Sequence, residues 1–404
     1  MPVLRGPAGG ACGDGAPNPV RRRGRPRTVD GMTSLGGAEM VDWNLAVATA
    51  TRLVRPGPEV SRDEARAVVA ELRRHAKSSE EHVRSFTRMG TEETHDTPVL
   101  VVDRAGWVRA NVAGFREVLK PLLEKMKDRR GSGPGGAVLG AVGGKVTGVE
   151  LGMLLSFLAS RVLGQYETFA PATRELPAGA NGGGRLLLVA PNIVHVEREL
   201  DVDPHDFRLW VCLHEETHRT QFSSVPWLRD HLEGEIQSFL GETEVDPMTV
   251  LERIREAAQS LAGGRPEGED DDGGRSFVEL VQTPAQRDIL ARLTAVMSLL
   301  EGHADYVMDG VGPDVVPSVT EIREKFKERR QRGASRLDQA LRKLLGLDAK
   351  LRQYRDGERF VRAVVEEVGM DGFNRVWTSP NTLPTKAEIA KPADWVARVH
   401  RKAD

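Results

Sequence analysis

The chain has 404 residues, of which 29% are charged and 39% hydrophobic, and its formal net charge is -2. At about 100–200 residues per domain, this length allows two or three domains, or one large domain with a sizeable core. The near-neutral charge argues against a dedicated nucleic-acid-binding protein, which usually carries a strong basic excess. Only two cysteines occur, so a disulfide framework and a cysteine-based zinc cluster are excluded, and a reducing, cytoplasmic location is favoured.

The first forty residues differ in composition from the rest of the chain. Residues 1–40 hold nine Gly, five Pro and six Arg, against three acidic residues. A basic stretch rich in Gly and Pro, with no long apolar run, predicts a disordered tail and not a signal peptide. Its arginines could instead bind nucleic acid or anionic lipid, but we expect no nucleic-acid partner. We expect residues 41–404 to form a single domain.

From residue 41 onward, helical periodicity dominates, and two short apolar runs predict strands. Helices are expected at Trp43–Leu53, Ser61–Arg74 and Gly106–Lys127, and strands at Pro98–Asp103 and Arg185–Ala190. The apolar segment Ala137–Leu163 contains three charged residues, so we expect an internal helix and no membrane span. These elements predict a mainly α (α+β) fold with a small sheet.

Three later helices are expected to begin in the same way, with a capping side chain before a proline, at Asp203-Pro204, Asp246-Pro247 and Thr283-Pro284. The glycine-flanked acidic run at residues 263–274 lacks the spaced oxygen ligands of a calcium loop. It predicts a mobile, solvated loop.

The helix that begins at Pro204 and is expected to reach about Phe222 carries the most informative motif. Its apolar stripe continues into two histidines on the same face, which consists of Phe207, Val211, His214 and His218. Histidines four residues apart project side by side, as two ligands of one tetrahedral zinc do. Glu215 lies about 100° around the helix, where it can take a proton from zinc-bound water. The alternative is that both histidines are ordinary core residues.

A catalytic zinc also needs a third protein ligand. The metzincin pattern is excluded because Gln221 and Ser224 occupy the positions where it requires Gly and His. Glu233 and Glu235 are the nearest carboxylates that follow the motif, but neither has a carboxylate four residues further on.

The helix that begins at Thr283-Pro284 offers a better ligand. Glu301 and Asp305 lie four residues apart on one face, so Glu301 can bind zinc while Asp305 accepts the free imidazole proton of a ligating histidine. Gly302 and Ala304 are expected to let this helix approach the motif helix closely. His303 is a possible alternative ligand, but it lies about 200° around the helix from Glu301, so both cannot face one metal.

The sequence resembles the actinobacterial zincin-like metallopeptidase type 2 family, whose members are also described as hydrolases associated with deazaflavin-coenzyme biosynthesis. The resemblance covers nearly everything after Met40. The matching stretches are Val102–Asn111, Val162–Tyr166, Ala190–Asn192, His214–Phe222, Glu301–Asp309 and Leu383–Thr385. The resemblance implies a zincin-like fold, a zinc site of His214, His218 and Glu301, and Glu215 as general base.

We therefore expect a zinc-dependent metallohydrolase, a peptidase that acts on a peptide or protein through zinc-activated water. A catalytically silent zincin-like binding or assembly protein with a structural zinc is the alternative. The strand at Arg185–Ala190 is a candidate edge for an extended peptide substrate. The donor that stabilises the oxyanion stays open among Tyr166, His195, His231, His303 and Tyr306.

Overall fold

The structure, a computed structural model, describes residues 41–90, 97–129, 134–169, 184–242, 283–331 and 347–400. All of these lie within one unit, Ala38–Asp404. The predicted basic tail (1–40), the predicted acidic loop (263–274) and the helix start at Asp246-Pro247 lie outside the described residues.

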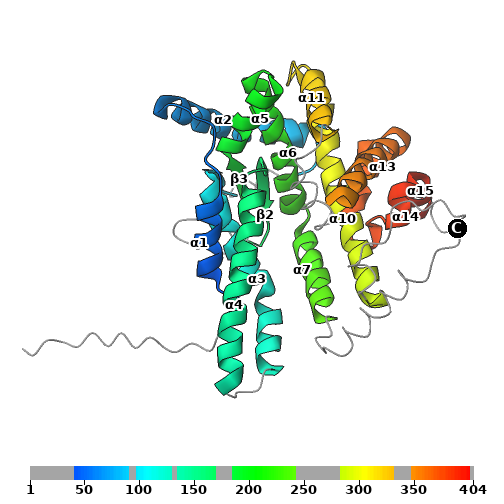
Figure 1. Cartoon of the computed structure of the whole chain (residues 1–404). Helices are drawn as coiled ribbons and strands as arrows, with labels where there is room; N and C mark the ends of the chain where they lie inside the picture. The colour runs from blue at the N-terminus through cyan, green and yellow to red at the C-terminus, as the bar shows by residue number, and fades with distance from the viewer. Residues whose placement is uncertain are drawn as a thin grey trace, which may run out of the picture. The chain divides into compact units, whose positions relative to one another are not determined.

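The described chain is mainly helical, with one small sheet, as the sequence predicts (Figure 1). The long helices are α1 (Trp43–Leu53), α2 (Arg62–Thr87), α3 (Arg104–Arg129), α4 (Pro134–Ala159), α5 (Ala190–Leu200), α6 (Pro204–Ser224), α7 (Pro226–Gly241), α10 (Pro284–Gly310), α11 (Val319–Gln331) and α13 (Leu347–Phe373). Short helices close the chain at Asn374–Trp377, Pro380–Thr382, α14 (Lys386–Ala390) and α15 (Pro392–His400). The strands are β1 (Val99–Val102), β2 (Gly164–Glu167) and β3 (Arg185–Val189). In the part of the chain described here, no helix combines the length and apolarity needed to cross a membrane.

The sheet has the strand order β1-β3-β2. β1 runs parallel to β3, with Val99 opposite Leu186, and β2 runs antiparallel to it, with Gly164 opposite Leu188. The prediction that β3 offers a free edge is therefore wrong, because strands pair with it on both sides. The edge strand on the side of α6 is β2, which the sequence analysis did not predict.

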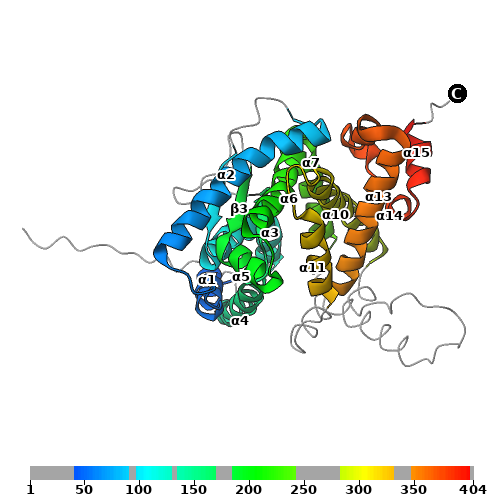
Figure 2. The same cartoon turned by 90° about the horizontal axis from the view of Figure 1, so that it is seen from above.

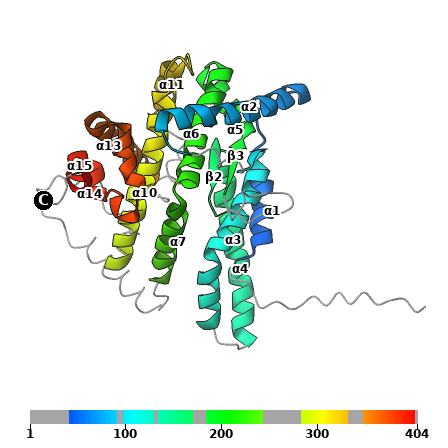
Figure 3. The same ribbon diagram turned by 180° about the vertical axis from the view of Figure 1, so that it is seen from behind.

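β3 is buried on both faces, which explains the uninterrupted apolar run Leu186–Val189. Leu187 and Val189 pack into a core formed with α1, α3 and α4. Leu188 faces the opposite way, into a core that α2, α5 and α6 share. α6, the helix of the histidine motif, therefore packs against the sheet. Seen from behind, α2 runs across α6 (Figure 3).

A third core joins α10 to α7, α13 and the short C-terminal helices. α10 and α13 lie side by side in the view from above (Figure 2). They cross where Gly302 meets Gly357, and a Cβ at either glycine would overlap the backbone of the other helix. The expectation that Gly302 brings α10 close to α6 is wrong, because this glycine lies against α13. The side of α10 that faces α6 carries Glu301 instead.

Candidate metal centre

The helix of the histidine motif, α6, begins where the sequence predicts. The carboxylate of Asp203 accepts a hydrogen bond from the backbone N–H of Asp206 at 2.9 Å, and Pro204 is the first helical residue. Phe207 and Val211 are buried in the core below β3. The face that these two residues share with the histidines therefore points into the molecule.

His214 and His218 direct the same ring nitrogen toward one point. Their Nε2 atoms lie 3.2 Å apart, and the two rings meet edge to face. Two ligands of one tetrahedral zinc with bonds of about 2.0–2.1 Å lie about 3.3 Å apart. The two imidazoles are thus spaced as a shared metal ion requires.

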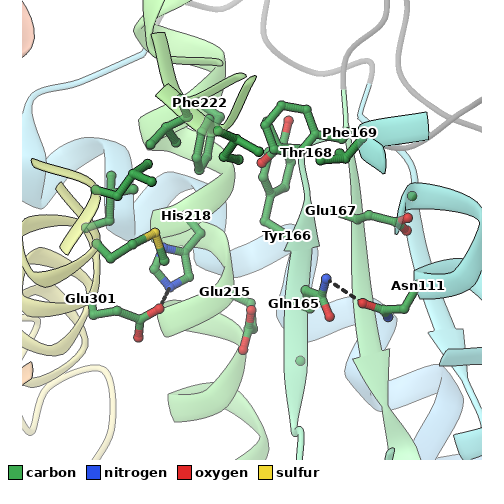
Figure 4. A pocket seen from close by; sticks show the side chains of 18 of the residues that line it. Asn111, Gln165, Tyr166, Glu167, Thr168, Phe169, Glu215, His218, Phe222 and Glu301 are labelled. Carbon is green, nitrogen blue, oxygen red and sulfur yellow. Dashed lines mark hydrogen bonds and ion pairs between the residues drawn. The ribbon is translucent and has the colours of Figure 1, made fainter. Parts of the chain in front are cut away.

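Glu301 of α10 faces these two nitrogens from across the gap between the helices. One carboxylate oxygen lies 3.7 Å from Nε2 of His214. The other lies 3.7 Å from Nε2 of His218 (Figure 4). The three donor atoms lie within 4.8 Å of one another. Two imidazoles and one carboxylate suit a divalent transition metal, and the three side chains stay partly exposed to the adjoining cavity.

Asp305 lies one turn after Glu301, on the outer side of His214. Its Oδ1 is 3.6 Å from Nδ1 of His214, which is longer than a hydrogen bond. The carboxylate is nevertheless on the ring nitrogen that faces away from the shared point. That is the place from which outer carboxylates orient metal-binding histidines.

Gln221 links His218 to His303. Its Oε1 accepts a hydrogen bond from Nδ1 of His218 at 3.0 Å, and its Nε2 donates to Nδ1 of His303 at 3.0 Å and to the carbonyl oxygen of Leu300 at 3.0 Å. This role of Gln221 was not predicted from the sequence. Its position three residues after His218 on the same helix could have predicted that the two side chains are neighbours.

His303, the possible alternative ligand, lies behind this glutamine. It is fully buried, and its ring packs 5.2 Å from that of Phe373 and 5.5 Å from that of Trp377. Burial and the nearby His218 lower the pKa of His303 to about 3, so the ring is neutral. The structure therefore brings together His214, His218 and Glu301 and leaves His303 apart.

Glu215 lies beside the donor cluster, which consists of His214, His218 and Glu301. Its side chain lies between α6 and β2 (Figure 4). Its carboxyl group fits there because residue 164 is glycine: a Cβ at Gly164 would lie 2.5 Å from Cγ of Glu215. Burial raises the pKa of Glu215 to about 7; His214 opposes this rise and Glu301 adds to it. A carboxyl group with such a pKa can both take and return a proton near neutral pH.

The carboxylates make the cluster attractive to a cation. Burial alone lowers the pKa of His214, but Glu301, Glu215 and Asp305 together raise it to about 9. The pKa of His218 is lowered by burial and by its neighbour His214. Three carboxylates thus surround two imidazoles that cannot readily both be protonated. A divalent cation between the two rings would compensate the negative charge of these carboxylates.

The donor cluster lies at one end of a cavity of about 670 Å³. The polar end is lined by His214, Glu215, His218 and Glu301 and by residues of the edge strand β2. The other lining side chains are mostly apolar: Phe115, Val118, Phe169, Phe222, Leu232, Ile236, Leu290, Leu293, Met297 and Leu300. Phe115 and Met297 are 40% and 41% exposed, so the cavity opens to solvent on this side.

The other candidate residues lie elsewhere. Glu235 pairs with Arg292 at 2.8 Å, and Glu233 is exposed on α7. Among the five candidate oxyanion donors, only Tyr166 lines the cavity, where its ring stacks on Phe222 and its hydroxyl accepts a hydrogen bond from the N–H of Gly184 at 3.2 Å.

Two imidazoles and a carboxylate beside a buried glutamate are an arrangement suited to a metallohydrolase, and comparisons with known proteins support this class. A family model described as zincin-like metallopeptidase matches residues 41–396. The chain therefore belongs to the zincin-like metallopeptidase family. It is also similar to a solved structure from Chloroflexus aurantiacus described as "a putative hydrolase with a novel fold", at 31% identity and a TM-score of 0.63, over 90% of this chain and 100% of that one. Among curated proteins, none matches the chain in sequence.

Proposed function

We propose that this protein is a zinc-dependent peptidase in which His214, His218 and Glu301 hold one zinc ion and Glu215 is the general base. The observation that carries the proposal is the convergence of two Nε2 atoms 3.2 Å apart and a carboxylate 3.7 Å from each, next to a buried glutamate at the end of an open cavity. When bound, the zinc would supply a Lewis acid that polarises the scissile carbonyl and makes a nearby water more acidic.

The side chains of the protein would do the rest of the chemistry. Glu215 would take a proton from the attacking water and pass it to the leaving nitrogen, for which a pKa near neutrality is suited. Asp305 would hold the imidazole of His214 in the tautomer that leaves Nε2 free. Of the candidate donors, Tyr166 lines the cavity, and its role as hydrogen-bond donor to the carbonyl oxygen is part of this proposal.

The edge strand favours a peptide over a small substrate. β2 pairs on one side with β3, and four of its residues, Gly164–Glu167, line the cavity on the other. An extended peptide can add to such an edge through main-chain hydrogen bonds. Its chain would then pass Glu215, and an apolar side chain of the peptide could enter the apolar end of the cavity.

Cleavage of a peptide library by zinc-loaded protein tests this function. We expect wild type to cut next to large apolar residues, and Glu215→Gln to lose at least about 100-fold in rate while it keeps its zinc. Glu233→Gln, which removes an exposed glutamate on α7, is the matched control and should cut like wild type. Zinc binding without cleavage over a broad library would contradict the peptidase and support the silent binding protein.

Several expectations from the sequence remain proposals. We propose that residues 41–404 act as one domain and that the protein works in the cytoplasm. The link to deazaflavin-coenzyme biosynthesis stays a prediction of the family resemblance.

A further inference from the structure

A second group of metal-binding side chains lies where α2 packs on the start of α6, outside the cavity. Glu71 and His75 are one helical turn apart on α2, and His205 is the second residue of α6. Oε1 of Glu71 lies 3.0 Å from Nδ1 of His205 and 3.5 Å from Nε2 of His75. One oxygen and two imidazole nitrogens therefore converge from two helices.

His75 is the residue that needs an explanation. It is only 6% exposed, and its Nε2 has no hydrogen-bond partner among the described residues. Buried polar atoms are nearly always hydrogen-bonded, so a buried nitrogen without a hydrogen bond indicates that a ligand binds there.

Arg208 holds Glu71 in a suitable orientation. Its Nη1 pairs with Oε2 of Glu71, which leaves Oε1 turned toward the two histidines. The same guanidinium binds both oxygens of Glu197, at 2.5 Å and 2.9 Å. One guanidinium thus pairs with two carboxylates. Hydrogen bonds that orient a ligating carboxylate from behind are typical of metal sites.

We propose that Glu71, His75 and His205 bind a second divalent metal ion, of the zinc type, that cross-links α2 to the first turn of α6. The donor distances of 3.0 and 3.5 Å bracket the spacing of about 3.3 Å between ligands of one tetrahedral zinc. The side chain of His205 is 64% exposed, which leaves room for water as a fourth ligand. The ion would fix the start of the helix that carries His214 and His218.

Counting metal ions tests this site separately from the one in the cavity. Purified protein is loaded with zinc, desalted and analysed by mass spectrometry of the metal. We expect two zinc ions per chain in wild type, one in His205→Ala, and one in His214→Ala/His218→Ala. His195→Ala is the matched control, because His195 is also an exposed helical histidine near a glutamate, and it should keep two ions.

The same variants give a second readout that does not depend on activity. Zinc should raise the melting temperature of His214→Ala/His218→Ala, and adding His205→Ala to that variant should abolish the rise. His205 is exposed, so its loss leaves the fold intact, which circular dichroism checks. If His205→Ala binds as much zinc as wild type, the second site does not exist, whatever the cavity site and its activity prove to be.

Discussion

Oε1 of Gln221 lies 3.0 Å from Nδ1 of His218, the ring nitrogen opposite the one that faces Glu301. The amide group can only accept through this oxygen, so it fixes the proton on Nδ1 and leaves Nε2 with a free electron pair. On its other side the same amide donates to His303 and to the carbonyl of Leu300. The fully buried His303 therefore holds the glutamine that orients His218.

Replacing this glutamine should weaken metal binding without unfolding the protein. Gln221→Met keeps the volume but cannot accept the proton of His218, so we expect zinc affinity to fall about 10–100-fold. Titration with a chromogenic zinc chelator measures the change. The control is Gln237→Met, on α7, whose amide donates to the carbonyl of Val118 at 3.2 Å and which should keep its affinity. Equal affinities in both variants would show that Gln221 does not position His218.

Gly164→Ala should displace the carboxyl group of Glu215, the proposed general base. The new Cβ would lie 2.5 Å from Cγ of Glu215, closer than carbon atoms can approach, so the carboxyl group must move. We expect the rate of peptide cleavage to fall by at least 10-fold while zinc content stays unchanged. Gly234→Ala is the control, because nothing lies within 4 Å of its Cβ and alanine stabilises a helix by up to about 1 kcal/mol. Unchanged cleavage by Gly164→Ala would argue against Glu215 as the base.

Gly302→Ala should destabilise the contact between α10 and α13. An added Cβ would overlap the backbone of Gly357, which cannot move as a side chain can. Overpacking of this kind costs about 1–3 kcal/mol, so the melting temperature should drop by several degrees. Gly241→Ala, where no atom of the described residues lies within 4 Å of the added Cβ, should melt like wild type or above it. A wild-type melting temperature for Gly302→Ala would mean that the two helices are further apart than described.

The ion pair between Glu388 of α14 and Arg398 of α15 predicts that the stability of the fold depends on pH. Burial alone raises the pKa of Glu388, but hydrogen bonds from Arg398 and Thr385 outweigh this and lower it. A carboxylate with a lowered pKa stabilises the fold above its unfolded pKa, and this stability is lost as the pH falls through the folded pKa. Glu388→Gln should therefore lose about 1–2 kcal/mol at pH 7 and approach wild type near pH 3, as thermal melts across this range would measure.

The control for this pH effect is Glu367→Gln, which removes an exposed glutamate on α13. It should follow wild type at every pH. A stability difference between Glu388→Gln and wild type that is as large at pH 3 as at pH 7 would contradict the role given to the Arg398 pair.

The parts of the fold that the sequence predicted best carry strong local signals. α6 and α10 begin at the expected caps because Asp203 and Thr283 each bind a backbone N–H of the first turn, ahead of a proline. β3 was predicted because burial on both faces requires a continuous apolar run. The i, i+4 spacing of His214 and His218 predicted that their rings lie side by side, as they do.

The features of the fold and site that were not predicted from the sequence depend on tertiary contacts. β2 is short and polar, and it is a strand only because β3 pairs with it. For the same reason the sequence could not reveal which strand forms the edge beside the cavity. The contact of Gly302 with α13 and the link from Gln221 to His303 join segments 55 and 82 residues apart, and no local periodicity reports such contacts.

Diffraction at the zinc absorption edge, from crystals grown with zinc, tests the metal centre most directly. We predict an anomalous peak about 2.0–2.1 Å from Nε2 of both His214 and His218 and about 2.0–2.2 Å from a carboxylate oxygen of Glu301. The absence of a peak between these three side chains, or a peak bound by His303 in place of Glu301, would contradict the site.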